Sequence, residues 1–170
     1  MISRGIDFET LSLKDALDLA VLIEEEARDR YVELAGQMRI HQSSDAAAFF
    51  EVMTRAEETH RGQLLAQRRK LYGDAEVMIT RQMFFEIEAP RFDDARVKMT
   101  LPEALEEALK AEEKARNFFE RMLTQVRNPE VGRLFATLRE EEVEHRRLVL
   151  GQISAARPSK RRSWGRGPEL

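Results

Sequence analysis

Hydrophobic residues recur at intervals of three and four positions along four stretches of this chain, and polar residues fill the positions between them. This period is typical of helices that bury one face. The stripe of the second stretch, for example, runs from Phe49 to Leu71 and ends near Gly73, a common helix stop. The predicted helix starts are Ser12 with Asp15, Ser43 or Ser44, Thr100 with Glu103, and Asn128 with Pro129.

The connections between these helices differ in length. Short polar turns join the first helix to the second and the third to the fourth, whereas residues 74–99 separate the two pairs. This connection could hold a short helix within "EVMITRQMFF", and it is long enough to return along a bundle. We therefore predict an all-α fold: a ferritin-like four-helix bundle of two antiparallel helical hairpins joined by a long crossover. The bundle is expected to occupy residues 1–156.

The composition favours a helical bundle and excludes several classes of protein. Charged residues make up 35 % and hydrophobic residues 42 % of the 170 positions, with only 8 Gly and 5 Pro. No apolar run approaches the ~20 residues needed to cross a bilayer, and the start lacks the apolar region of a secretory signal. The absence of Cys excludes disulfides, thiolate-bound metal sites and thiol catalysis. We expect a cytoplasmic protein that does not bind membranes.

The net charge of −3 is unevenly distributed. Residues 157–170 hold five of the 28 Lys and Arg but one of the 31 Asp and Glu, so the preceding part of the chain is clearly acidic. An acidic body argues against nucleic-acid binding across a broad surface. The basic tail is expected to be disordered. It is either a solvated end or an arm that docks on an anionic partner.

Polar residues interrupt each predicted apolar stripe near its middle. Glu57 and His60 lie between Met53 and Leu64, where helical spacing otherwise places apolar residues. Comparable interruptions occur in the other three helices, at Glu24, at Glu112, and at Glu142 with His145. The glutamates beside these positions are interpreted as solvent-facing. They are Glu25, Glu26, Glu58, Glu113, Glu141 and Glu144, and among them Glu113 is the nearest alternative metal ligand.

The two halves of the chain repeat this arrangement. "EEEARDRY" from Glu24 aligns with "EEKARNFF" from Glu112, and "EETH" from Glu57 aligns with "EVEH" from Glu142. Each half thus contributes a lone core Glu on one helix and a Glu-x-x-His on the next. A Glu-x-x-His arises easily by chance in a chain so rich in Glu. Two such motifs on core stripes, in matching halves, indicate a common site.

These residue types fit a pair of metal ions. Four unpartnered carboxylates would cost several kcal/mol each to bury, and two divalent cations would offset their charge. A spacing of three residues places Glu and His on one helical face, where both reach the same ion. Oxygen and imidazole ligands suit iron or manganese. We predict two Fe ions per chain, or Mn or a mixed pair, with six ligands: Glu24, Glu57, His60, Glu112, Glu142 and His145.

With these motifs, residues 12–153 resemble the rubrerythrin group of the ferritin-like superfamily. The likeness is closest in "EEEARDRY", where a ligand Glu is followed seven residues later by Tyr. The resemblance implies that Glu57 and Glu142 bridge the two ions and that His60 and His145 bind one ion each. It also implies that Tyr31 donates a hydrogen bond to a ligand carboxylate.

The chain departs from that group in two places, and its own two halves differ at a third. Typical members carry a Cys-ligated rubredoxin iron, and this chain has no Cys, so electrons must come from a separate donor protein or from the ferrous ions themselves. Ala115 stands where the group has an additional Glu one turn after the ligand Glu112, which weighs against efficient rubrerythrin-style peroxidase turnover. Phe119 stands at the second-half equivalent of Tyr31.

Several functions remain open at this level. A non-haem di-iron oxidoreductase of rubrerythrin type would oxidise a diferrous site with hydrogen peroxide or dioxygen. An iron-handling or storage protein would use the same ferroxidase site and need a cavity or shell partner, which the basic tail could contact. A di-iron or di-manganese oxidase would act on an organic substrate, and a metal-free scaffold would only bind partners. A homodimer is expected from the prevalence of two-fold assemblies and from the resemblance.

Overall fold

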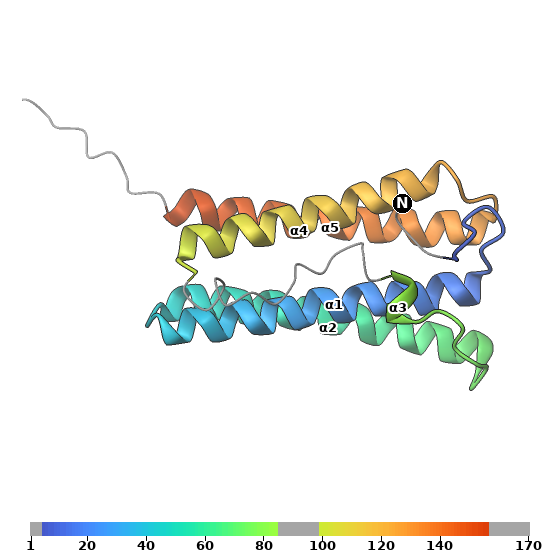
Figure 1. Cartoon of the computed structure of the whole chain (residues 1–170), viewed down its shortest axis with the longest axis horizontal. Helices are drawn as coiled ribbons and strands as arrows, with labels where there is room; N and C mark the ends of the chain where they lie inside the picture. The colour runs from blue at the N-terminus through green and yellow to red at the C-terminus, as the bar shows by residue number, and fades with distance from the viewer. Residues whose placement is uncertain (1–4, 85–98, 157–170) are drawn as a thin grey trace, which may run out of the picture.

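The computed structural model of the chain describes residues 5–84 and 99–156. Within these ranges there are helices and no strand. The helices are α1 (Leu13–Ile40), α2 (Ser44–Tyr72), α3 (Arg81–Phe84), α4 (Leu101–Leu123) and α5 (Pro129–Ala156). α1 and α2 form one antiparallel hairpin and α4 and α5 form the other, as Figure 1 shows. The predicted all-α four-helix bundle is therefore confirmed, and the short helix expected in the crossover corresponds to α3.

Local sequence signals set the helix ends. The Ser12 side chain accepts a hydrogen bond of 3.1 Å from the backbone N–H of Asp15, and α1 begins at the next residue after Ser12. Thr100 opens α4 with the predicted capping box, and the Asn128 side chain accepts from a backbone N–H in the first turn of α5. Gly73 ends α2 with a φ of 56°, in the left-handed region that favours glycine.

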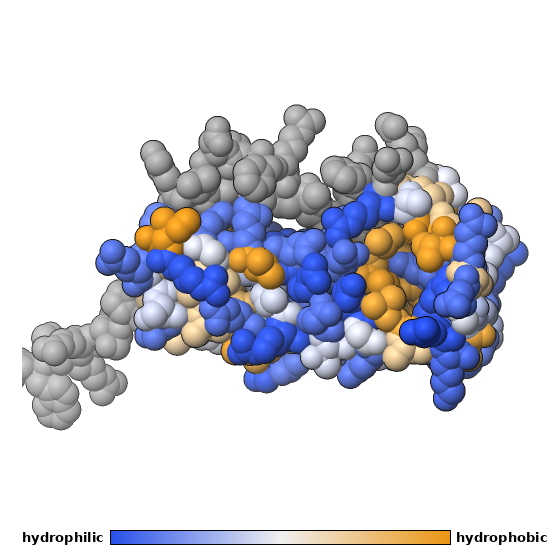
Figure 2. Space-filling view, turned by 90° about the horizontal axis from the view of Figure 1, so that it is seen from below, coloured by the Kyte–Doolittle hydropathy of each residue, from blue (hydrophilic) through white to orange (hydrophobic). Residues whose placement is uncertain are grey.

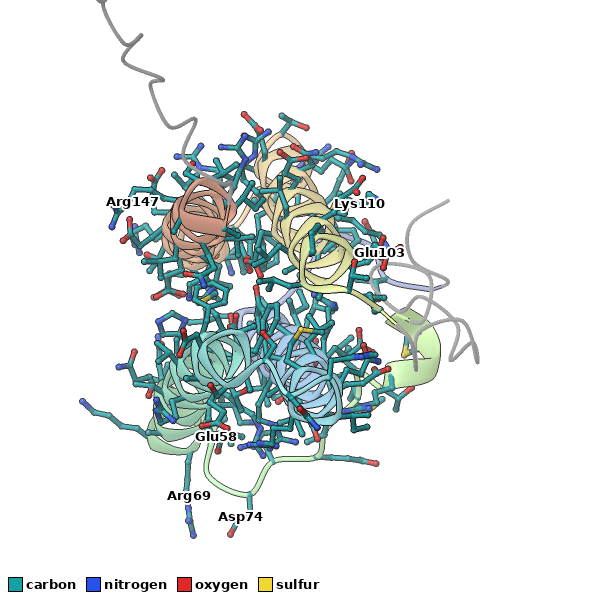
Figure 3. The ribbon with its side chains drawn as sticks, turned by 90° about the vertical axis from the view of Figure 1, so that its left-hand side faces the viewer. Glu58, Arg69, Asp74, Glu103, Lys110 and Arg147 are labelled. Carbon is teal, nitrogen blue, oxygen red and sulfur yellow. The ribbon has the colours of Figure 1, made fainter. Side chains whose placement is uncertain are left out.

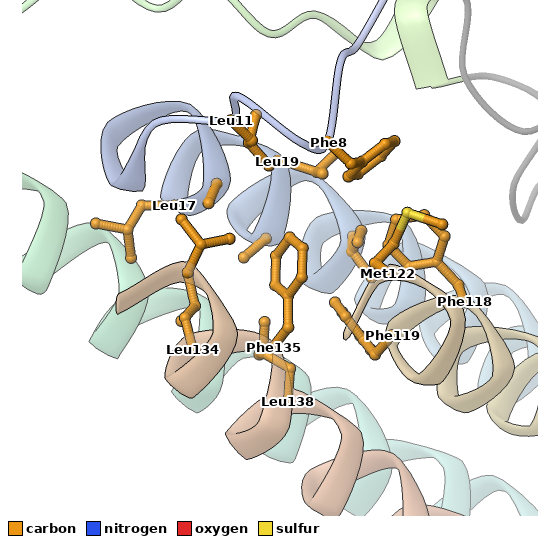
Figure 4. Packing of buried hydrophobic residues seen from close by; sticks show 14 of the residues in the cluster. Phe8, Leu11, Leu17, Leu19, Phe118, Phe119, Met122, Leu134, Phe135 and Leu138 are labelled. Atoms are coloured by element: carbon orange, nitrogen blue, oxygen red, sulfur yellow. The ribbon is translucent and has the colours of Figure 1, made fainter. Parts of the chain in front are cut away.

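The hydrophobic core consists of two clusters that follow one another along the bundle. The first lies where α1 begins and α4 turns into α5; it includes Phe8 and Leu11 from the N-terminal segment (Figure 4). Within it the rings of Phe119 and Phe135 are 5.6 Å apart between centroids. The second cluster surrounds Phe50 at the other end of the hairpins. The middle of the bundle therefore lies between two apolar clusters and belongs to neither.

Most, but not all, of the predicted apolar positions lie inside. Leu71 belongs to the predicted stripe of α2, yet it is 50 % exposed. This expectation was wrong because the neighbouring Tyr72 packs against the first cluster in its place. None of the helices in the described part of the chain carries an apolar stretch suited to crossing a membrane.

Charged residues cover the outside of the bundle. Seen end-on in Figure 3, the helices stand at the corners of a square, with α5 beside α2 and α4 beside α1. Glu58, Lys110 and Arg147 point away from its centre. The α1–α2 side is largely hydrophilic, with hydrophobic residues gathered toward one end (Figure 2). Charged groups in the interior are therefore exceptions to the general pattern of this molecule.

One buried ion pair fixes the chain where it leaves α2. Arg68 Nε donates to the Asp18 carboxylate at 2.7 Å, and Arg68 Nη1 donates to the carbonyl of Gly73 at 2.8 Å. Lys14 Nζ donates to the carbonyl of Glu76 at 2.7 Å. These contacts hold the segment after α2 against α1, and they leave the space between α2 and α5 uncovered by it.

We expect Arg68→Met to lower the melting temperature by several degrees, because it removes the guanidinium from the buried Asp18 carboxylate and leaves Lys14, 3.0 Å away, as its remaining partner. Arg69→Met is the matched control, since Arg69 is the next residue and points outward in Figure 3. Thermal unfolding followed by circular dichroism measures both variants. Equal melting temperatures for the two would contradict a stabilising role for the Arg68–Asp18 pair.

Candidate metal centre

Charged and imidazole side chains fill the space between the two apolar clusters. Each long helix contributes at least one, at the position where its apolar stripe is interrupted. Their exposed fractions lie between 2 % and 6 %, so they are as buried as the core around them. The residues are Glu24 from α1, Glu57 from α2, Glu112 from α4, and Glu142 and His145 from α5.

The structure brings all six residues of the predicted set together. His145 Nδ1 lies 3.1 Å from Glu57 Oε1 and 3.5 Å from Glu112 Oε2. His60 Nδ1 lies 3.8 Å from Glu24 Oε2, and the two imidazole rings stack with centroids 5.2 Å apart. Glu142 offers an oxygen within 4.8 Å of ligand atoms of Glu112 and His145. The repeated motifs of the two halves therefore meet at one level of the bundle.

Several of these atoms have no hydrogen-bond partner. Buried polar atoms are normally satisfied, so a group of unsatisfied ones needs an explanation. Here they face one another at distances suited to ligands around a shared cation, and all are oxygen or imidazole nitrogen, which suits iron or manganese. The unpartnered atoms are Glu24 Oε2, Glu57 Oε1, Glu112 Oε2, His60 Nδ1 and His145 Nδ1.

Within the described ranges, three groups of side chains could hold a metal ion, each with ligand atoms within 4.8 Å of one another. His60 and His145 each belong to two of the groups, so the groups form one continuous centre. The groups are Glu57 with His60 and His145, Glu24 with His60 and Glu141, and Glu112 with Glu142 and His145.

Without a cation, the centre balances its charges by holding protons. Burial, and then the nearby carboxylates, raise the pKa of Glu24 and of Glu142 well above the ordinary value. Burial alone would lower the pKa of His145, but the carboxylates of Glu112 and Glu57 raise it to about 11. Burial alone would likewise raise the pKa of Glu112, but His145 beside it lowers that pKa. A metal ion would compete with these protons for the same atoms.

Tyr31 lies beside this centre. Its side chain is fully buried, and its hydroxyl donates a hydrogen bond to Glu112 Oε1. Burial and the Glu112 charge raise the pKa of Tyr31 well above its ordinary value, which keeps the hydroxyl protonated as a donor. The ring packs on Phe50 in the second apolar cluster, with centroids 6.1 Å apart. Phe119, the second-half equivalent, packs in the first cluster instead.

Of two neighbouring glutamates interpreted as solvent-facing, one fits that interpretation and one does not. Glu113, the nearest alternative ligand, pairs with Arg146 at 3.0 Å and joins none of the three groups. Glu141 was interpreted as solvent-facing, yet its Oε2 lies 3.9 Å from His60 Nδ1. It sits at the edge of the core stripe of α5, on the side that faces α2. Its four-residue spacing from His145, which puts both on one side of the helix, is the signal that could have found it.

Comparison with known proteins gives a consistent result. Residues 15–153 match the family model of Rubrerythrin. The crystal structure of an uncharacterized conserved protein from Magnetospirillum magnetotacticum is similar, with a TM-score of 0.72 and 27 % sequence identity. That similarity covers 88 % of this chain and 99 % of the other. None of the curated proteins matches significantly. The match over most of its length shows that this chain belongs to the Rubrerythrin family, as its paired motifs had indicated.

Proposed function

We propose that this protein is a non-haem di-iron oxidoreductase that oxidises a diferrous site with hydrogen peroxide or dioxygen. The observation that carries the proposal is the meeting of unpartnered carboxylate and imidazole atoms from four helices in the middle of an otherwise apolar core. Membership of the Rubrerythrin family supports a di-iron protein. We further propose that electrons come from a separate donor protein or from the ferrous ions, since these 170 residues hold no Cys to bind a rubredoxin iron.

The proposed ligands divide between two ions. Glu24 and His60 would hold one ion, Glu112 and His145 the other, and Glu57 and Glu142 would bridge them. The closeness of Glu57 to both imidazoles supports its bridging position. When bound, two ferrous ions would supply one electron each, which with two protons reduces peroxide to two waters or dioxygen to peroxide.

The residues around the proposed ligands orient them and shield them from water. Tyr31 fixes Glu112 by donating to Oε1, which leaves the unpartnered Oε2 turned toward His145. The apolar clusters on either side keep bulk water from the buried carboxylates, so their charge acts on a cation with little screening. The four carboxylates together match the charge of two divalent ions.

The test is the metal content of wild type and of Glu57→Ala/His60→Ala, expressed with added iron and measured by inductively coupled plasma mass spectrometry. We expect about two Fe or Mn per wild-type chain and loss of both in the variant, which removes a bridge and an imidazole. Glu58→Ala/Arg61→Ala is the matched control, because these residues have the same spacing on α2 and pair with each other at 3.0 Å, outside the three ligand groups.

The metal content distinguishes the candidate functions. If wild type holds two ions per chain, rapid-mixing kinetics of the diferrous protein with peroxide and with dioxygen then identify the oxidant. Many iron ions per chain would favour storage over the proposed oxidoreductase. No metal in wild type, even after anaerobic addition of Fe²⁺, would refute the proposal.

A further inference from the structure

A groove runs along the bundle between α2 and α5, with a volume of about 460 Å³. Because the two helices are antiparallel, His60 and Glu141 line one end of the groove, while Leu71 and Glu130 line the other. Leucines and polar side chains alternate along its walls, among them Gln63, Gln67 and Thr137. The groove therefore connects the exterior with one side of the candidate metal centre.

The two sides of the centre differ in their access to solvent. On the His145 side, the side chains of His145, Glu57 and Glu112 are between 2 % and 5 % exposed. On the other side, His60 is 22 % and Glu141 is 28 % exposed. The twofold repeat in the sequence thus produces two unequal halves, one closed and one open to the groove.

Glu141 completes a group of ligand atoms on the open side. Its Oε2 lies 3.9 Å from His60 Nδ1, and Glu24 Oε2 lies 3.8 Å from the same nitrogen. Glu24 is 3 % exposed in its side chain, and its Oε2 is buried without a hydrogen-bond partner. An unpartnered carboxylate oxygen aimed at an imidazole nitrogen and a second carboxylate is suited to a divalent cation.

We propose that Glu141 is a further ligand of the ion on the His60 side, and that this ion enters and leaves through the α2–α5 groove. This inference rests on the proposed di-iron function and deepens it. Glu141 is the carboxylate that an arriving ion meets at the inner end of the groove, before Glu24 behind it. The side chains around the ion on the His145 side are at most 5 % exposed, so that ion is held more tightly and exchanges more slowly.

The test is anaerobic titration with Co²⁺, whose visible absorption reports on coordination and whose affinity is read by competition with a chelator. Wild type is expected to bind two Co²⁺ in two steps. Glu141→Gln keeps the size of the side chain and removes its charge; it should weaken the looser step at least tenfold and leave the tighter step unchanged. Glu140→Gln is the matched control, since Glu140 is the preceding residue and 64 % exposed in its side chain.

A second measurement follows release of Co²⁺ from the loaded protein into excess chelator. One of the two ions should leave wild type much faster than the other, and Glu141→Asp, which keeps the carboxylate, should stay closer to wild type than Glu141→Gln. Equal affinities and release rates in Glu141→Gln and wild type would overturn the role of Glu141 while leaving the di-iron function intact. An equal weakening of both steps would overturn its assignment to the His60 side. Absence of Co²⁺ binding in wild type would overturn both proposals.

Discussion

Replacing Glu142 with leucine should abolish binding of the metal pair and, in the same protein, stabilise the metal-free bundle. Glu142 is 6 % exposed, and burial together with the Glu112 carboxylate raises its pKa well above the ordinary value. Burying a polar group of this kind typically costs about 1–3 kcal/mol, and a hydrophobic residue of similar size avoids that cost in the metal-free protein. Loss of a proposed bridging ligand should weaken metal binding by more than the ~10–100-fold typical of residues outside the ligand set.

Denaturant unfolding in the presence of a chelator measures the stability, and metal analysis measures the binding. Glu140→Leu serves as the control, because it places the same residue on the outside of α5 and should change stability by no more than about 0.5 kcal/mol. A metal-free Glu142→Leu protein less stable than wild type would show that this carboxylate supports the fold. Retention of both ions would remove Glu142 from the ligand set.

The metal-free protein should lose stability as the pH rises from about 5.5 to about 8.5. The folded-state pKa of His145 is raised to about 11, so its contribution is complete below its ordinary value of 6.5 and is lost as the pH rises through the folded value. The raised pKa values of Glu24 and Glu142 act in the same direction, starting above their ordinary value of 4.5. Each proton that the folded state holds and the unfolded state has released changes the stability by at most about 1.4 kcal/mol per pH unit.

The lowered pKa of Glu112 acts in the opposite direction, but its contribution is lost only as the pH falls below the ordinary value of 4.5. Melting temperatures across this pH series, with chelator and with saturating Mn²⁺, provide the measurement. With Mn²⁺ the trend should reverse, because the ion replaces the protons and binds more tightly at higher pH. In Glu142→Leu the metal-free slope should be shallower than in Glu140→Leu. Rising stability of the metal-free wild type across the window would contradict these assignments.

The sequence was sufficient for the fold because its signals are local and agree with one another. The capping residues at Ser12 and Thr100 mark the starts of α1 and α4, and the apolar period identifies the buried faces. Leu71 shows where this reasoning fails. A period identifies one side of a helix, but at the end of α2 it does not tell which of two adjacent residues, Leu71 or Tyr72, packs against the core. The predictions for the tail and for crossover residues 85–98 concern residues outside the described ranges.

The positions of the site residues were also accessible from sequence. Glu24, Glu57, Glu112, Glu142 and His145 interrupt apolar stripes, and a residue on such a stripe is brought to the core whatever the details of packing. The repetition in both halves then indicated that the interruptions meet. Glu141 escaped this reasoning because it lies at the edge of the stripe of its own helix, and its neighbour His60 belongs to the other hairpin.

The sequence by itself therefore determined the bundle, its two hairpins and the six polar residues placed on the buried stripes, since all of these follow from spacing along single helices. The tertiary structure alone decided that the two halves of the centre are unequal. α5 packs beside α2 so that a groove remains over His60, whereas His145 is enclosed. Solvent access depends on how helices distant in sequence pack together, and the pattern along one helix does not predict that packing.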